Sequence, residues 1–95
     1  MSTAPERRWY AAVASLETCQ RCGAWGVQVS HCNLFRGLGQ KSPYFMTAAL
    51  CPECHHAIDN GNKLTQIVRR LDWLMAWAKT MLALWNRGLI KLEAK

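Results

Sequence analysis

The stretch Cys51-Pro-Glu-Cys-His-His-Ala-Ile-Asp59 decides how this chain folds, because its two cysteines have the spacing of metal ligands. A second pair, Cys19 and Cys22, has the same spacing and is separated from the first by 28 residues. Two such pairs form the ligand set of a closed, tetrahedral Zn²⁺ site. The sequence therefore predicts a structural zinc ion bound by Cys19, Cys22, Cys51 and Cys54.

Length and composition favour a single zinc-stabilised domain over residues 1–95. A chain of 95 residues buries only about 60–65% of its unfolded surface, so small domains often need a staple. The first residues lack the apolar run of a secretory signal, and Asp72 and Lys79 interrupt the longest apolar region. We expect no membrane association and a cytoplasmic location, where paired cysteines favour metal over disulfide. The fifth cysteine, Cys32, is expected either as a small buried apolar residue or as an extra ligand.

The charge balance points toward an anionic partner. Twelve lysines and arginines stand against six acidic residues. Such an excess favours nucleic acid, and DNA is the expected partner. The alternative is a soluble basic domain with no nucleic-acid role.

The periodicity predicts an α+β fold in which two helices flank a small core at residues 18–61. Thr3 and Glu6 form a capping box for a helix over residues 4–17. Strands are predicted at residues 25–31 and 44–50, and a short helix begins at Pro52. A long helix follows at residues 63–87, and Gly88 ends it.

The long helix carries two apolar stripes. One stripe contains Leu64, Ile67, Val68, Leu71, Leu74, Met75, Ala78, Met81, Leu82 and Trp85, and the other contains Trp73, Trp77 and Leu84. One stripe should cover the metal core. The Trp73/Trp77/Leu84 stripe either receives the N-terminal helix or forms a homodimer interface.

Three residues beside the cysteines suggest a second, chemical site. His55 and Asp59 are four apart on the short helix, so they share one face. That pair can present an imidazole and a carboxylate to Mg²⁺ or Mn²⁺, and His31, at the end of the first strand, would then act as a base near the same spot. The alternative is structural, with His55 closing the zinc knuckle and Asp59 interacting with the helix end.

The motifs together resemble the HNH, or ββα-metal, nucleases, and more closely a small prophage family that includes the nuclease-like protein YbcO. The resemblance covers residues 19–91. It is carried by Cys19-x-x-Cys22-Gly, Val29-Ser-His31-x-Asn33, Gly37-x-Gly39-x-Lys41-Ser-Pro43, Ala49-Leu-Cys51-x-x-Cys54-His55-x-x-Ile58-Asp59-x-Gly61 and Trp85-x-x-Gly88-Leu-Ile-Lys91.

This resemblance implies a zinc-stabilised ββα core and a phage-encoded endonuclease that acts in a bacterial host cell. It would hydrolyse DNA, including branched or recombination intermediates. His31 would be the general base, and His55 and Asp59 the catalytic-metal ligands. Asn33 would help to orient the site. The expected DNA contacts are Arg36, Lys41 and His56.

The sequence departs from the HNH pattern at three points. Ser30 stands where many members have a metal-binding Asp or His, and Tyr44 where relatives of the small family often carry an acidic residue. No asparagine occurs between Tyr44 and Leu50. The alternative function is therefore a catalytically weak or inactive zinc module that binds nucleic acid or a host protein.

Overall fold

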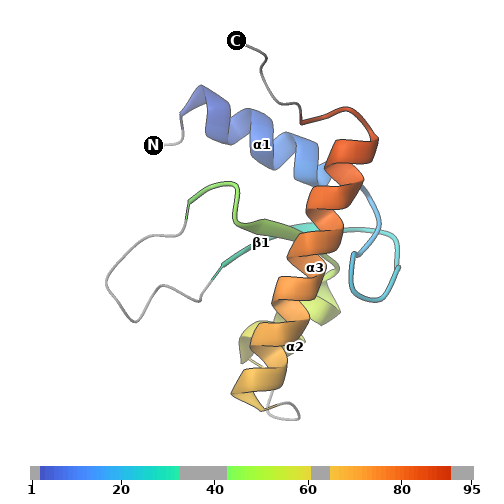
Figure 1. Ribbon diagram of the computed structural model, residues 1–95. Helices are drawn as coiled ribbons and strands as arrows, with labels where there is room; N and C mark the ends of the chain where they lie inside the picture. The colour runs from blue at the N-terminus through green and yellow to red at the C-terminus, as the bar shows by residue number, and fades with distance from the viewer. Residues whose placement is uncertain (1–2, 33–42, 61–64, 91–95) are drawn as a thin grey trace.

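The computed structural model describes residues 3–32, 43–60 and 65–90. In that part of the chain a two-stranded antiparallel sheet is surrounded by three helices, so the fold is mixed α+β (Figure 1). The elements, in chain order, are α1 (Ala4–Ala14), β1 (Gln28–His31), β2 (Thr47–Leu50), α2 (Pro52–Asn60) and α3 (Gln66–Asn86).

The first helix begins as the sequence predicts and ends early. Thr3 Oγ1 accepts a hydrogen bond from the Glu6 amide, and Glu6 Oε2 accepts one from the Thr3 amide, which completes the capping box. The helix ends at Ala14 and not at residue 17, because Glu17 adopts a positive φ of 64°. Leu16 nevertheless remains buried beside the sheet.

Both strands are shorter than predicted. Gly26, with φ of 95°, interrupts the extended chain before Gln28, so Trp25 forms only an isolated bridge with Thr18. A turn in which the Met46 amide donates to the Pro43 carbonyl delays the second strand to Thr47. The long helix also starts later than residue 63. Thr65 is its N-cap, and its hydroxyl accepts from the Val68 amide.

The register of the hairpin assigns the strand side chains to two faces. Gln28 pairs with Leu50, and His31 pairs with Thr47. Ala48 and Leu50 pack with α3 and with Cys19, Cys51 and Cys54 of the two cysteine pairs. Val29 and Ala49 pack on the other face, with Val13 and Leu16 near α1. Since strand side chains alternate, Gln28 and Ser30 share one face, and Val29 and His31 share the other.

The long helix buries the smaller of its two apolar stripes. Trp73 is 4% exposed and packs with the cysteines, and Leu84 is fully buried with Val13 and Leu16 of the N-terminal segment. Trp77 packs against the same core and donates its indole N–H to the Phe45 carbonyl at 3.0 Å. Packing within the chain therefore occupies this face, which favours the intramolecular alternative over the homodimer interface. The larger stripe was expected over the metal core, but only its members Leu74 and Met81 pack against the core, and most of its other described side chains are exposed.

Two hydroxyl groups connect α3 to the sheet. The buried Thr80 accepts from the Ala49 amide at 3.1 Å and donates to the Ala76 carbonyl at 2.8 Å. The buried Ser30 accepts from the Trp73 indole N–H at 3.0 Å. These bonds satisfy polar groups that the core would otherwise leave without partners, so they fix the position of the helix along the strands.

No helix in the described part of the chain combines the length and apolar character that crossing a bilayer requires.

Replacing Thr80 by valine tests the first of these links. The isosteric side chain leaves the Ala49 amide buried without its acceptor, so we expect the free energy of unfolding to fall by about 1–3 kcal/mol. Urea unfolding of the zinc-loaded protein measures the change. The matched control is Thr18→Val at an exposed threonine, which should change it by less than about 0.5 kcal/mol. Equal effects of the two variants would contradict the link.

Candidate functional site

The four cysteines of the two pairs converge on one point. Their sulfur atoms all lie within 4.8 Å of one another, and the Sγ atoms of Cys22 and Cys51 are 3.6 Å apart. Zn–S bonds of about 2.3 Å in a tetrahedron place neighbouring sulfurs about 3.8 Å apart. The cluster therefore fits a structural zinc ion, as the sequence predicts.

Each knuckle also supplies donors to its sulfur. The backbone amides of Arg21 and Cys22 point at Cys19 Sγ at 3.4 Å, and the Cys54 amide points at Cys51 Sγ at 3.5 Å. The turn closes at Gly23, which has a φ of 82° and donates its amide to the Cys19 carbonyl. These amides stabilise negative charge on sulfur, which is the state that binds metal.

The thiols of the cluster have unequal acidities. Burial raises the pKa of the Cys19 thiol, but the hydrogen bonds from the backbone around it prevail and lower this pKa to about 6. Burial raises the pKa of the Cys54 thiol to about 12, and its bonds to the other cysteines add to the rise. Four thiolates this close repel one another, so a bound cation is what allows all four to be ionised together.

Arg21 connects this centre to α3, a role that could not be predicted from its place inside the first knuckle. Its Nη1 donates to Cys54 Sγ at 3.4 Å, while Nε and Nη2 donate to Asp72 Oδ2 at 3.3 and 3.0 Å. The guanidinium thus lies between a ligand sulfur and the long helix, where it orients the ligand from outside the cluster.

Cys32 is not part of the metal centre. It is 2% exposed and belongs to the core cluster around Leu50, and its amide donates to the Met46 carbonyl. Among the described residues, the only group of three or more metal-ligating side chains is the four-cysteine cluster. The prediction of a small buried residue is therefore confirmed over that of an extra ligand.

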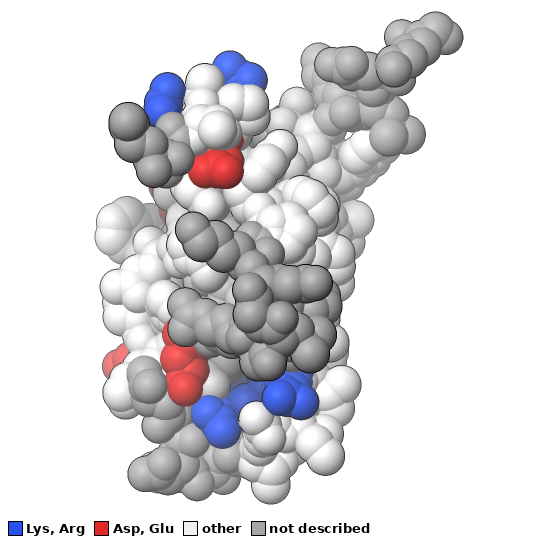
Figure 2. Space-filling model, turned by 90° about the vertical axis from the view of Figure 1, so that its left-hand side faces the viewer, with Lys and Arg blue, Asp and Glu red and all other residues white. Residues whose placement is uncertain are grey.

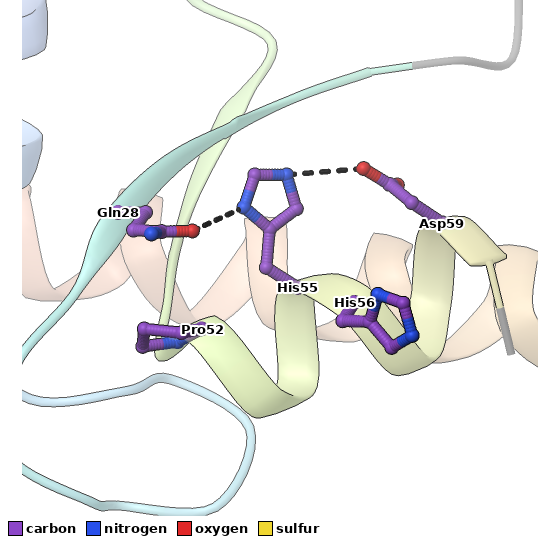
Figure 3. A pocket seen from close by; sticks show the side chains of 5 residues that line it. All are labelled: Gln28, Pro52, His55, His56 and Asp59. Carbon is purple, nitrogen blue, oxygen red and sulfur yellow. Dashed lines mark hydrogen bonds and ion pairs between the residues drawn. The ribbon is translucent and has the colours of Figure 1, made fainter.

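The structure brings His55 and Asp59 together, as their spacing predicts. His55 Nε2 and Asp59 Oδ2 are 3.0 Å apart across one turn of α2. On the other side of the ring, Nδ1 lies 2.8 Å from Gln28 Oε1 of β1 (Figure 3). These three residues, with Pro52 and His56, line an open pocket of about 330 Å³.

The partner of Nδ1 determines what the imidazole offers to the pocket. With the Gln28 amide oxygen as acceptor, Nδ1 carries the hydrogen, and Nε2 faces the carboxylate. Metal-binding histidines have this arrangement, since an acceptor on one nitrogen orients the other toward the ion. A protonated imidazole paired with Asp59 fits the same distances. Gln28 was missed from the sequence, because only the hairpin register brings it to α2.

His31 does not join this pair. Its ring packs edge-on against Tyr10 of α1, with centroids 5.4 Å apart, on the sheet face that it shares with Val29. Gln28, whose amide reaches His55, occupies the other face. The structure therefore does not bring His31 together with His55 and Asp59, contrary to what the sequence led us to expect. Ser30, the position where many HNH proteins place a ligand, is fully buried against Trp73.

The remaining predicted site residues divide into two groups. His56 is exposed and lines the pocket, but it leaves α2 in a different direction from His55 (Figure 3). Asn33, Arg36 and Lys41 lie outside the described residues.

Comparison of the chain with protein-family models, with curated proteins and with solved structures found no match in any of the three. What is established is a small α+β protein whose four clustered cysteines are arranged to bind a metal ion.

Metal content tests the four-cysteine centre. We expect one zinc ion per chain, and we expect Cys51→Ser to lose that stoichiometry and to unfold, because the ion contributes to folding. The matched control is Cys32→Ser, which removes a buried thiol outside the cluster and should keep full zinc content. Elemental analysis and circular dichroism of both variants are the measurements. Loss of zinc from the Cys32 variant alone would contradict the assignment.

Proposed function

We propose that the chain is a zinc-stabilised, HNH-type endonuclease that hydrolyses DNA phosphodiesters with a second divalent ion bound by His55 and Asp59. The observation that carries the proposal is the 3.0 Å approach of His55 Nε2 to Asp59 Oδ2, with Nδ1 held by Gln28. The order β1, β2, α2, with the second knuckle at the start of α2, supports the ββα core that the family resemblance implies.

The spacing of the two donor atoms supports metal binding. Two ligands at about 2.1 Å from an octahedral ion and at right angles to each other are about 3.0 Å apart. His55 and Asp59 contribute only two ligands, which leaves positions for water and for a phosphate oxygen. A Mg²⁺ or Mn²⁺ ion bound there would stabilise charge on the phosphodiester and activate a water molecule. Gln28 orients the imidazole, and the open pocket gives a backbone phosphate access to both side chains.

The positive charge also supports a DNA substrate. Basic side chains occur near both ends of the face drawn in Figure 2, with acidic side chains beside them. Five of the twelve basic residues lie outside the described part of the chain, namely Arg36, Lys41, Lys63, Lys91 and Lys95. Of these, Arg36 and Lys41 are the DNA contacts that the sequence and the family resemblance suggest. The resemblance suggests a phage origin and branched substrates.

The second candidate is a zinc module that binds nucleic acid without cutting it. The contact of His31 with Tyr10 favours this alternative, because it holds the expected general base on the α1 side of the sheet. In that case His55 and Asp59 form a histidine–carboxylate ion pair that stabilises α2 from its surface.

Substitutions in the pocket test the nuclease. We expect Mg²⁺- or Mn²⁺-dependent nicking of plasmid or junction DNA to fall to background in His55→Ala and Asp59→Ala. Gln28→Leu should lose about 10–100-fold, as is typical when a residue that orients a ligand is removed. The matched control is Glu53→Ala, which removes an exposed carboxylate from the same helix and should keep full activity. Zinc content should be unchanged in all four variants.

The contrary outcomes are equally specific. Equal cutting by Asp59→Ala and Glu53→Ala would show that the activity belongs elsewhere or to a contaminant. Binding to DNA with a steep salt dependence, but without turnover in Mg²⁺ or Mn²⁺, would select the binding module.

A further inference from the structure

The outer face of α3 carries a regular apolar repeat that no other helix or strand of the described chain covers. Its members follow one another at alternating intervals of three and four residues, and they are Val68, Leu71, Met75, Ala78, Leu82 and Trp85. All six are exposed, and the five larger side chains are between 41% and 61% exposed. Alternating three- and four-residue spacing is the a/d pattern of a two-helix coiled coil. We call these six residues the outer stripe.

The outer stripe is separate from the surface that packs on the sheet. At about 100° per residue, its mean direction lies roughly 170° round the helix from Trp73, Thr80 and Leu84. The helix is thus apolar on two opposite sides, and only one of them has a partner among the described residues. In Figure 1, α3 runs in front of the sheet, with no other element drawn across its near side.

The apolar area is large for a chain of this size. Together with Ile67, which is 70% exposed, the larger side chains of the stripe present on the order of 600 Å² of apolar surface. That is at the upper end of the largest patch on a typical monomer, about 300–600 Å². It approaches the share, about 800 Å², that each partner contributes to a standard interface.

We propose that the outer stripe is a homodimer interface, in which α3 of one chain packs antiparallel against α3 of a second copy. A two-fold axis near Met75 and Ala78 would place Val68 opposite the partner's Trp85 and Leu71 opposite the partner's Leu82. The small side chain of Ala78 at the centre lets the two helices approach closely. Such an isologous contact uses the same patch twice, so it needs no second surface on the molecule.

The charges beside the stripe determine the orientation. Asp72 and Lys79 flank it on one side, seven residues apart and therefore at equivalent positions of the repeat. In the antiparallel arrangement these positions face each other, so Asp72 meets the partner's Lys79 at two symmetric points. In a parallel pair they would face Ile67 and Leu74 across the stripe, and no ion pair would form. Asp72 also accepts from Arg21, through Oδ2, and a carboxylate accommodates both partners.

Sedimentation equilibrium of the zinc-loaded full chain tests the interface. We expect twice the chain mass of 10.8 kDa, and we expect Leu82→Glu to weaken dimerisation by about a hundredfold or more, since it buries an unpaired carboxylate. Ala11→Glu, at an exposed position of α1, is the matched control and should remain dimeric. Zinc content and helicity should be unchanged in both variants. A wild-type chain that stays monomeric up to millimolar concentration would overturn the proposal, as would equal dissociation of the two variants.

A second measurement tests the orientation. Zero-length carbodiimide crosslinking of a mixture of ¹⁴N- and ¹⁵N-labelled chains should join Asp72 of one chain to Lys79 of the other. Within one helix the two residues are about 10 Å apart, which is too far for a zero-length link. Lys79→Glu should weaken the dimer about tenfold, with Arg70→Glu as the unaffected control. Crosslinks that never combine the two labels, or a dimer indifferent to Lys79→Glu, would rule out the antiparallel arrangement.

Discussion

The convergence of two cysteine pairs, 28 residues apart in the sequence, is the constraint on which the rest of this structure depends. The first knuckle precedes the hairpin and the second follows it, so the cluster closes the loop that contains both strands. Because α2 begins at Pro52, inside the second knuckle, its direction is set by the same point. Arg21 then extends the cluster to α3 through Asp72. Without a metal ion the four cysteines would be thiols with no common partner, and we expect the hairpin, α2 and α3 to lose this arrangement.

The parts of the fold that the sequence predicts are those encoded within a few residues. The capping box at Thr3, the metal-ligand spacing and the helix start at Pro52 each depend on neighbours in the chain, and each is found as predicted. The observed strands are shorter than the predicted ones, because Gly26 and the turn after Pro43 break the extended backbone. The alternation of apolar and polar side chains continues through both breaks. Periodicity reports side chains and not backbone angles, so it missed both breaks.

The orientation of the long helix shows a different limit. Two stripes on α3 satisfy the helical period, and hydrophobicity alone favours the larger one as the inner face. The structure buries the smaller one, because Thr80 and the indole of Trp73 match polar groups on the sheet, at the Ala49 amide and the Ser30 hydroxyl. Specific hydrogen bonds therefore decided between the stripes. The pairing of His55 with Asp59 was predictable from i,i+4 spacing, whereas the side of the sheet that His31 occupies depends on which helix covers each face.

The most direct test of this account is to identify the atoms that bind zinc in the purified protein. X-ray absorption at the zinc edge of the purified protein should show four sulfur neighbours at about 2.3 Å and no nitrogen or oxygen in the first shell. That result would show that the four cysteines Cys19, Cys22, Cys51 and Cys54 alone bind the zinc ion, and that His55 belongs to the open pocket instead. A spectrum with three or fewer sulfurs and a histidine nitrogen would contradict it, because the second knuckle and the pocket would then be one site.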